Sequence, residues 1–127
     1  MKSEKIKLLI KALKENNDIN IIFGENIAYS SFFRDLEQKG LLIQPIFTKK
    51  IDCYTNSLVQ IQIIDGKDSS TRMQIKEDME VVEKFLVSKL KDFSGFETLI
   101  VRASGDEVIL KNNKDRIVFT KRFDFYY

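Results

Sequence analysis

The sequence predicts one α+β domain: an antiparallel sheet crossed by one long helix, with a short N-terminal helix. Apolar residues repeat with helical period at the start of the chain and over a longer stretch in its middle, and β-branched and aromatic residues fill the segments between and after them. Because the 127 residues hold no internal repeat and no Gly/Ser/Pro-rich linker, we expect a single domain over residues 1–127.

The first helix is predicted over residues 3–15. Its apolar residues recur at intervals of three and four, which places them on one helical face, and lysines occupy the other side. Asn16 and Asn17 are expected to end the helix. The apolar positions are Ile6, Leu9, Ile10 and Leu13.

The segment of residues 16–40 has the least regular pattern. Ile19 to Phe23 is predicted as a short strand, which Gly24 ends. Residues 30–39 are predicted as a helix that Gly40 caps, because three apolar side chains share one helical face. These side chains are Phe32, Phe33 and Leu36.

A hairpin of two long strands is predicted next. Residues 41–54 are β-branched and aromatic, and Pro45 places this strand at an edge or at a bulge, because proline lacks the N–H that a sheet ladder needs. Residues 57–64 alternate between apolar side chains and Gln60 and Gln62, as a half-buried strand does. The turn is expected at Asn56.

The main helix is predicted from Thr71 to Lys91. Thr71 and Gln74 have the spacing of a capping box, and the helix follows the polar loop 65–70. Its outer face mixes both charge signs, as an ordinary solvated helix does. The apolar stripe consists of Ile75, Met79, Val82, Leu86 and Leu90.

Three strands are predicted to close the chain, over residues 97–103, 108–111 and 116–127, with a turn at 112–115. In the last strand, the side chains of Phe119, Phe123 and Phe125 share one face. Neither face is fully polar near the end, so we expect both to be covered.

Composition excludes several classes of function. The chain has no histidine and one cysteine, Cys53, so Ser-His and Cys-His catalysis, histidine–metal sites and an intramolecular disulfide are excluded. We therefore expect no enzyme activity, no metal and no cofactor. The 21 Lys and Arg nearly balance the 19 Asp and Glu, and this weak charge does not indicate a nucleic-acid or membrane partner. The start of the chain lacks the apolar core of a secretory signal.

A metal-dependent nuclease is the main enzymatic alternative. Asp52, Asp65 and Lys67 offer carboxylates and a cation. However, Gln60 and Gln62 occupy the strand where a second carboxylate is needed, and Asp65-Gly66 is typical of a turn.

The closing strands are rich in positive charge. This cluster has two interpretations: a surface for DNA or an acidic protein rim, or the charge that edge strands carry against aggregation. Tyr126 and Tyr127 favour a protein interface over base stacking, because no RNA-binding signature accompanies them. The basic residues are Lys111, Lys114, Arg116, Lys121 and Arg122.

The order of these segments resembles a known family. Three runs carry the resemblance: Cys53-Tyr-Thr-Asn-Ser-Leu-Val-Gln-Ile-Gln-Ile-Ile, Leu99-Ile-Val-Arg and Asp115-Arg-Ile-Val-Phe-Thr-Lys-Arg-Phe-Asp-Phe-Tyr-Tyr, with the long helix between the first two. In layout they are similar to the tail-terminator, neck and head–tail joining proteins of tailed bacteriophages and related contractile particles. The likeness covers the first helix and residues 41–127.

This resemblance implies a structural protein of a virion or phage-tail-like particle, assembled in the bacterial cytoplasm. The implied partners are copies of itself, in a ring that typically has six subunits (a hexamer) in this family, and the tail tube, sheath and connector proteins. The ring would cap the tube, and no membrane or sequence-specific nucleic acid is implied. The terminal strand is expected to pair with a neighbouring subunit. The predicted interface residues are Asp65, Lys67, Asp68, Lys111, Lys114, Arg116, Lys121, Arg122, Phe125, Tyr126 and Tyr127.

A second hypothesis needs no particle. A small binding module of the immunity, antitoxin or adaptor type would grip one protein partner through its long helix and a sheet edge.

Overall fold

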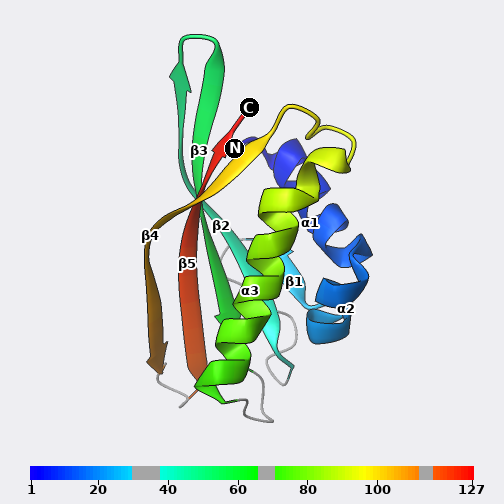
Figure 1. Cartoon of the computed structure of the whole chain (residues 1–127), viewed down its shortest axis with the longest axis vertical. Helices are drawn as coiled ribbons and strands as arrows, with labels where there is room; N and C mark the ends of the chain where they lie inside the picture. Colours follow the sequence, from blue (N-terminus) through cyan, green and yellow to red (C-terminus); the bar gives the residue numbers. More distant parts are fainter. Residues whose placement is uncertain (30–37, 66–70, 112–115) are drawn as a thin grey trace.

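The computed structural model describes residues 1–29, 38–65, 71–111 and 116–127. Within these residues one five-stranded sheet carries helices on one of its faces (Figure 1). A short 3₁₀ turn follows the last α-helix. The elements are α1 (Ser3–Glu15), α2 (Asn17–Phe23), β1 (Ile27–Tyr29), β2 (Gly40–Ile51), β3 (Tyr54–Ile64), α3 (Arg72–Ser88), η1 (Leu90–Asp92), β4 (Ile100–Lys111) and β5 (Ile117–Tyr126).

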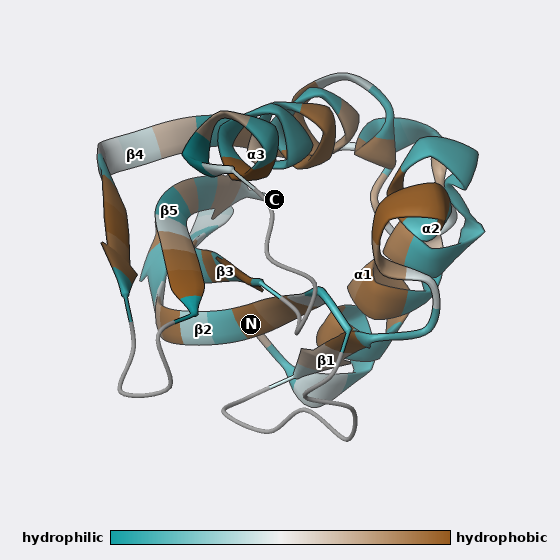
Figure 2. Cartoon of the chain, turned by 90° about the horizontal axis from the view of Figure 1, so that it is seen from below, coloured by the Kyte–Doolittle hydropathy of each residue, from teal (hydrophilic) through white to brown (hydrophobic). Residues whose placement is uncertain are grey.

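The prediction of an antiparallel sheet crossed by one long helix is wrong. The strand order is β1-β2-β3-β5-β4, and β1 runs parallel to β2, so the sheet is mixed. The described α-helices are short, with 13, 7 and 17 residues, and they cover the sheet together. Figure 2 shows how the sheet curves around them. The fold is therefore a mixed α+β arrangement dominated by its sheet.

Two elements that the sequence did not predict, α2 and β1, lie within residues 16–40, the segment with the least regular pattern. Residues 19–23, predicted as a strand, belong to helix α2, whose N-cap is Asn16: its side-chain oxygen accepts a hydrogen bond from the Ile19 N–H at 3.1 Å. Ile19 and Phe23 lie one helical turn apart and are buried. The side-chain cap and the helical spacing of the two buried residues favour a helix here, although the segment is rich in β-branched residues, which are common in strands. The helix predicted over residues 30–39 falls mostly on residues 30–37, outside the described residues.

Helix α1 has the predicted bounds. The predicted hairpin forms from β2 and β3, but its turn is not at the predicted residue. Asn56 lies within β3, and the chain reverses at Asp52 and Cys53 instead. Asp52 has φ 47°, a left-handed conformation that Asp adopts more readily than most residues. The prediction for Pro45 is confirmed, because the register of β2 and β3 shifts between Pro45 and Phe47. The hairpin projects beyond the rest of the molecule (Figure 1).

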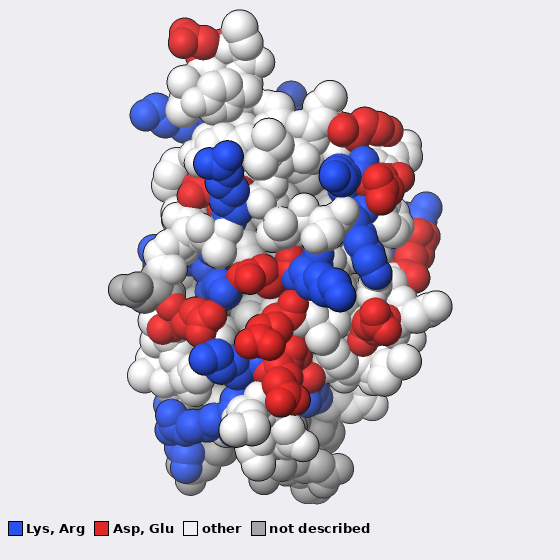
Figure 3. Space-filling model, viewed as in Figure 1, with Lys and Arg blue, Asp and Glu red and all other residues white. Residues whose placement is uncertain are grey.

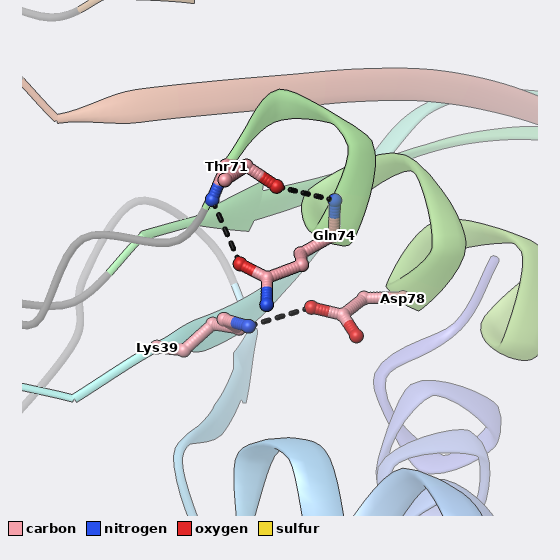
Figure 4. A network of polar contacts seen from close by, with 4 residues as sticks. All are labelled: Lys39, Thr71, Gln74 and Asp78. Atoms are coloured by element: carbon pink, nitrogen blue, oxygen red, sulfur yellow. Dashed lines mark hydrogen bonds and ion pairs between the residues drawn. The ribbon is translucent and has the colours of Figure 1, made fainter.

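Helix α3 begins with the predicted capping box. The Gln74 N–H donates to the Thr71 hydroxyl at 3.1 Å, and the Thr71 N–H donates to the Gln74 side chain at 2.9 Å (Figure 4). The ammonium of Lys39 lies 2.6 Å from Asp78, which ties the start of β2 to this helix. Acidic and basic side chains alternate over the face seen in Figure 3. The α-helix ends at Ser88, and η1 continues the chain.

Two predicted strands are one. β4 runs without a break from Ile100 to Lys111, and its register with β5 shifts between Ser104 and Val108. Gly105 within this irregularity has φ 78°, which glycine adopts without strain. The residues between the two predicted strands therefore belong to β4 and form the irregular part of its pairing with β5.

One continuous core holds these elements together. Helices α1 and α3 contribute apolar stripes, and β3 and β5 contribute every second side chain. The least exposed of these residues are Leu9, Leu13, Val59, Ile61, Ile63, Ile75, Val82, Phe119, Phe123 and Phe125. This packing occupies one face of the sheet, and no helix or strand of the described residues covers the other, called the uncovered face below.

Candidate interaction surface

The uncovered face of the sheet has a polar centre. Gln60 of β3 donates its side-chain N–H to Gln44 of β2 at 2.8 Å and accepts from the guanidinium of Arg122 in β5 at 3.2 Å. Gln44, Gln60 and Arg122 thus form one row of hydrogen-bonded side chains across β2, β3 and β5. Such cross-strand pairs fix side-chain positions at a modest gain in stability.

Two further pairs extend this centre. Gln62 donates to the Thr120 hydroxyl at 3.1 Å, and Asn56 donates to the carboxylate of Asp124 at 3.2 Å. Gln62 and Thr120 are directly opposed in β3 and β5, whereas Asn56 and Asp124 contact each other diagonally across the same two strands. The centre of the uncovered face is therefore ordered and polar, which suits specific contacts with another protein better than nonspecific apolar association.

Apolar side chains surround the polar centre. Strand β4 exposes Ile100 to 55%, Val108 to 41% and Leu110 to 62%, and the register places all three on the uncovered face. On the projecting hairpin, Phe47 is 48% and Tyr54 43% exposed. Five exposed apolar side chains thus share the uncovered face, while others, Ile21 and Met73 among them, lie on the helices. A group of exposed apolar side chains on one face can mark an interaction site.

An open hollow of about 610 Å³ lies at the base of the hairpin. The rings of Tyr54 and Tyr126 meet edge to face along it, with centroids 5.9 Å apart. The exposed guanidinium of Arg102 adds a cation at the same place. Tyrosine and arginine are the side chains that most often anchor protein interfaces. The other lining residues are Cys53, Thr98, Ile100 and Tyr127.

The predicted pairing of the terminal strand with a neighbouring subunit is wrong. Strand β5 lies between β3 and β4, so its backbone hydrogen bonds are used on both sides. The strand is instead an interior strand of the sheet, and its residues Phe119, Phe123 and Phe125 are buried in the core.

The structure separates the predicted interface residues of β5. Phe125 is fully buried in the core. Arg122 and Tyr126 lie on the uncovered face, where Arg122 contacts Gln60 and Tyr126 contacts Tyr54. Lys121 points to the covered face.

Lys121 is held by two carboxylates. Its ammonium lies 2.5 Å from Glu83 of α3 and 2.9 Å from Glu107 of β4. Burial alone lowers the pKa of Lys121, but the hydrogen bonds to Glu107 and Glu83 outweigh it and the pKa is raised. The hydrogen bond from Lys121 lowers the pKa of Glu107. This cluster joins the helix to the sheet, so Lys121 serves the fold.

The remaining predicted residues do not form one patch. Asp65 is buried at the end of β3, and its N–H donates to the Ile117 carbonyl at 2.9 Å. Lys111 is exposed at the end of β4, and Arg116 is half-buried before β5. Three others lie outside the described residues: Lys67, Asp68 and Lys114.

Tyr127 belongs to a contact network with the first helix. The ammonium of Lys5 lies over its ring at 4.6 Å from the centroid, and also over the ring of Phe96 at 5.2 Å. The same ammonium donates to the Gly95 carbonyl at 2.9 Å. Tyr127 therefore connects β5 to α1, besides lining the hollow.

Sequence reasoning missed the exposed residues of β4 and of the hairpin. Ile100 and Arg102 lay in a predicted strand, but their exposure depends on β4 being the outermost strand. No signal in the local pattern gives that position. Tyr54 was assigned to the preceding strand, because the turn was placed at Asn56.

In the described part of the chain, no three His, Cys, Asp or Glu side chains gather as metal ligands would. No helix there is long and apolar enough to cross a membrane. The sequence matches no known family, and none of the curated proteins is significantly similar to it.

Proposed function

We propose that this chain is a structural subunit of a phage or phage-tail-like particle, forming a homo-oligomeric ring that caps the tail tube and joins it to the neck or connector. The observation that carries the proposal is the uncovered sheet face, which combines an ordered polar centre with exposed apolar side chains at its margins. A surface of this kind supports function by contact between proteins.

The rigidity of the subunit also supports the proposal. The fold and the contacts inside the subunit are consistent with a rigid building block, since both chain ends pack against the sheet near the base of the hairpin (Figure 1).

Electron microscopy of particles from cells that encode this chain tests the proposal. A tagged copy, labelled with gold, is expected at one position, the junction of tail tube and neck. Label along the whole tube, or particles that lack the chain, would contradict it. Particles assembled without the chain should carry tubes of uncontrolled length.

The second candidate, a small protein-binding module, is favoured by one feature. The hollow beside Tyr54, Tyr126 and Arg102 offers an aromatic wall and a cation to a single partner side chain. Affinity purification that yields one stoichiometric partner unrelated to tail proteins would favour this candidate over the ring.

A further inference from the structure

Tyrosine is concentrated at one place in this chain. The sequence has four tyrosines and no tryptophan, and three of the four, Tyr54, Tyr126 and Tyr127, line the hollow at the base of the hairpin. The volume of the hollow, about 610 Å³, lies in the range of ligand-binding clefts. The hollow therefore offers aromatic contact surface to a ligand of several groups rather than to a single ion.

Arg102 supplies the positive charge of this hollow. It lies two residues after Ile100 on β4, so both side chains belong to the uncovered face, and Arg102 is exposed. No ion pair joins it to a carboxylate of the described residues. Asp124 is directly opposite Arg102 in β5, but its carboxylate accepts a hydrogen bond from the Asn56 side chain at 3.2 Å. The guanidinium can therefore bind a carboxylate from outside the fold.

The surroundings of the hollow also favour a negative ligand. None of its described lining residues is acidic. A second cation, the exposed Lys49, lies on the same face, because Lys49 is opposite Asn56 and Asn56 is opposite Tyr126. Against these two cations stands the carboxylate of Asp124, which Asn56 already binds. Complementary charge therefore selects a partner that brings a negative group to Arg102.

A carboxylate fits this site better than the phosphates of a nucleic acid. A guanidinium binds one carboxylate through two parallel hydrogen bonds. A single-stranded nucleic acid needs a groove of cations along its backbone and free aromatic faces for its bases. Here Tyr54 and Tyr126 meet edge to face with centroids 5.9 Å apart, so one ring covers part of the other's face. The 21 Lys and Arg of the chain are also nearly balanced by 19 Asp and Glu.

We propose that the hollow binds an acidic segment of a partner protein, in which an Asp or Glu side chain pairs with Arg102 and a neighbouring aromatic side chain packs against Tyr54 and Tyr126. Ile100 lines the same hollow and is 55% exposed, so it adds apolar surface to this contact. The inference rests on the part of the proposed function in which the uncovered face contacts other proteins, and it names the chemistry of one such contact. Tyrosine and arginine are common anchors of protein interfaces.

Fluorine NMR of the tyrosines tests this assignment. Protein labelled with fluorotyrosine gives signals from the three tyrosines of the hollow and from Tyr29 in β1, which does not line it. Tyrosine-to-phenylalanine variants assign the signals. The probe is the blocked peptide acetyl-Gly-Phe-Glu-Phe-Gly-amide, and the matched control peptide has Gln in place of Glu. The unmodified sequence is used first, so that no variant has to fold for the site to be tested.

The Glu peptide should shift the signals of Tyr54 and Tyr126 and leave that of Tyr29 unchanged. It should bind at least about tenfold more tightly than the Gln peptide, because its carboxylate forms a charge-assisted pair with the guanidinium. Arg102→Gln should remove this preference. Arg72→Gln makes the same charge change at an exposed position of α3 and should retain the preference.

Four results would overturn the inference. Equal binding of the two peptides would reject the carboxylate, and tighter binding of a single-stranded oligothymidylate at the same signals would indicate a phosphate ligand instead. Shifts of the same signals with protein concentration alone would show that a second copy occupies the hollow. No shift with either peptide would reject the site.

Native mass spectrometry of the same samples separates this inference from the proposed ring. A closed ring that binds neither peptide would reject the hollow as a site and leave the ring in place. A chain that is monomeric at every concentration, yet prefers the Glu peptide, would reject the ring and support the acidic segment as the ligand of the hollow.

Discussion

The hydroxyls of Ser57 and Tyr127 lie 2.8 Å apart, although 70 positions of sequence separate the two residues. The Ser57 hydroxyl also lies 2.9 Å from the hydroxyl of Thr48 in β2. Backbone bonds between Tyr127 and Thr55, at 2.6 and 2.9 Å, hold the same region. The base of the projecting hairpin is thus fixed to β5, which makes the hairpin a stiff arm.

Removing the Tyr127 hydroxyl tests this fixation. Tyr127→Phe should lower the free energy of unfolding by about 1 kcal/mol, because the buried Ser57 hydroxyl loses one of its two partners. Urea denaturation measures the change. The conservative variant Tyr126→Phe is the control, and an equal loss there would contradict a specific role for the Tyr127 hydroxyl.

The capping box of α3 gives a second prediction. Thr71→Ala removes the acceptor of the Gln74 N–H and should destabilise the protein by about 1 kcal/mol. Thr71→Ser keeps a hydroxyl at the same position and should retain most of the stability. Thermal denaturation followed by circular dichroism distinguishes them, and equal midpoints for both variants would show that the cap contributes nothing.

The Lys121 cluster gives a third prediction. Lys121→Met leaves the carboxylate of Glu83 half-buried without its cation, and should cost about 1 to 2 kcal/mol, between the values of exposed and buried pairs. The double variant Lys121→Met with Glu83→Leu lacks the unpaired carboxylate and should lose less stability. If it loses as much free energy of unfolding as Lys121→Met alone, the unpaired carboxylate is not the cause.

The pH dependence of the same cluster has a definite sign. The pKa of Glu107 is lowered in the folded state, so its contribution is present at neutral pH and is lost as the pH falls through that pKa. Because this side chain is about a third exposed, solvent screening limits the contribution to about 0.5 kcal/mol. At pH 7 the wild-type protein should have a larger free energy of unfolding than Glu107→Gln. Urea denaturation at decreasing pH should show that this difference becomes smaller. A constant difference would contradict the lowered pKa.

The elements that could be predicted from the sequence are those determined by neighbouring residues. Helix α1, the capping box of Thr71, the start of α3 and the bulge at Pro45 depend on spacing or on the chemistry of one residue. The strand order depends on contacts between distant segments, and residues 16–40 carry too short a pattern to place α2 and β1. The same limit applies to the predicted interface. The aromatic residues of β5 suggested a contact with another subunit, but only the strand order shows that β5 lies between β3 and β4.

The exposed apolar residues of β4 give a further prediction. Ile100→Lys combined with Leu110→Lys places charges among the exposed apolar side chains of the uncovered face, which the proposed ring is expected to bury, and should raise the dissociation constant of the oligomer at least about tenfold. Ile21→Lys with Met73→Lys makes the same change at exposed positions of the helices and should have no effect. Sedimentation velocity over a concentration series measures both. Equal weakening by the two pairs would point to a general charge effect rather than to burial of the uncovered face.

The most direct test of self-assembly is the native mass of the unmodified chain. One subunit has a mass of 14.9 kDa. Over a dilution series, native mass spectrometry should show a single closed multiple of that mass, with few intermediate species. A mass of one subunit at every concentration, or a continuous distribution of open chains that never closes, would contradict the ring.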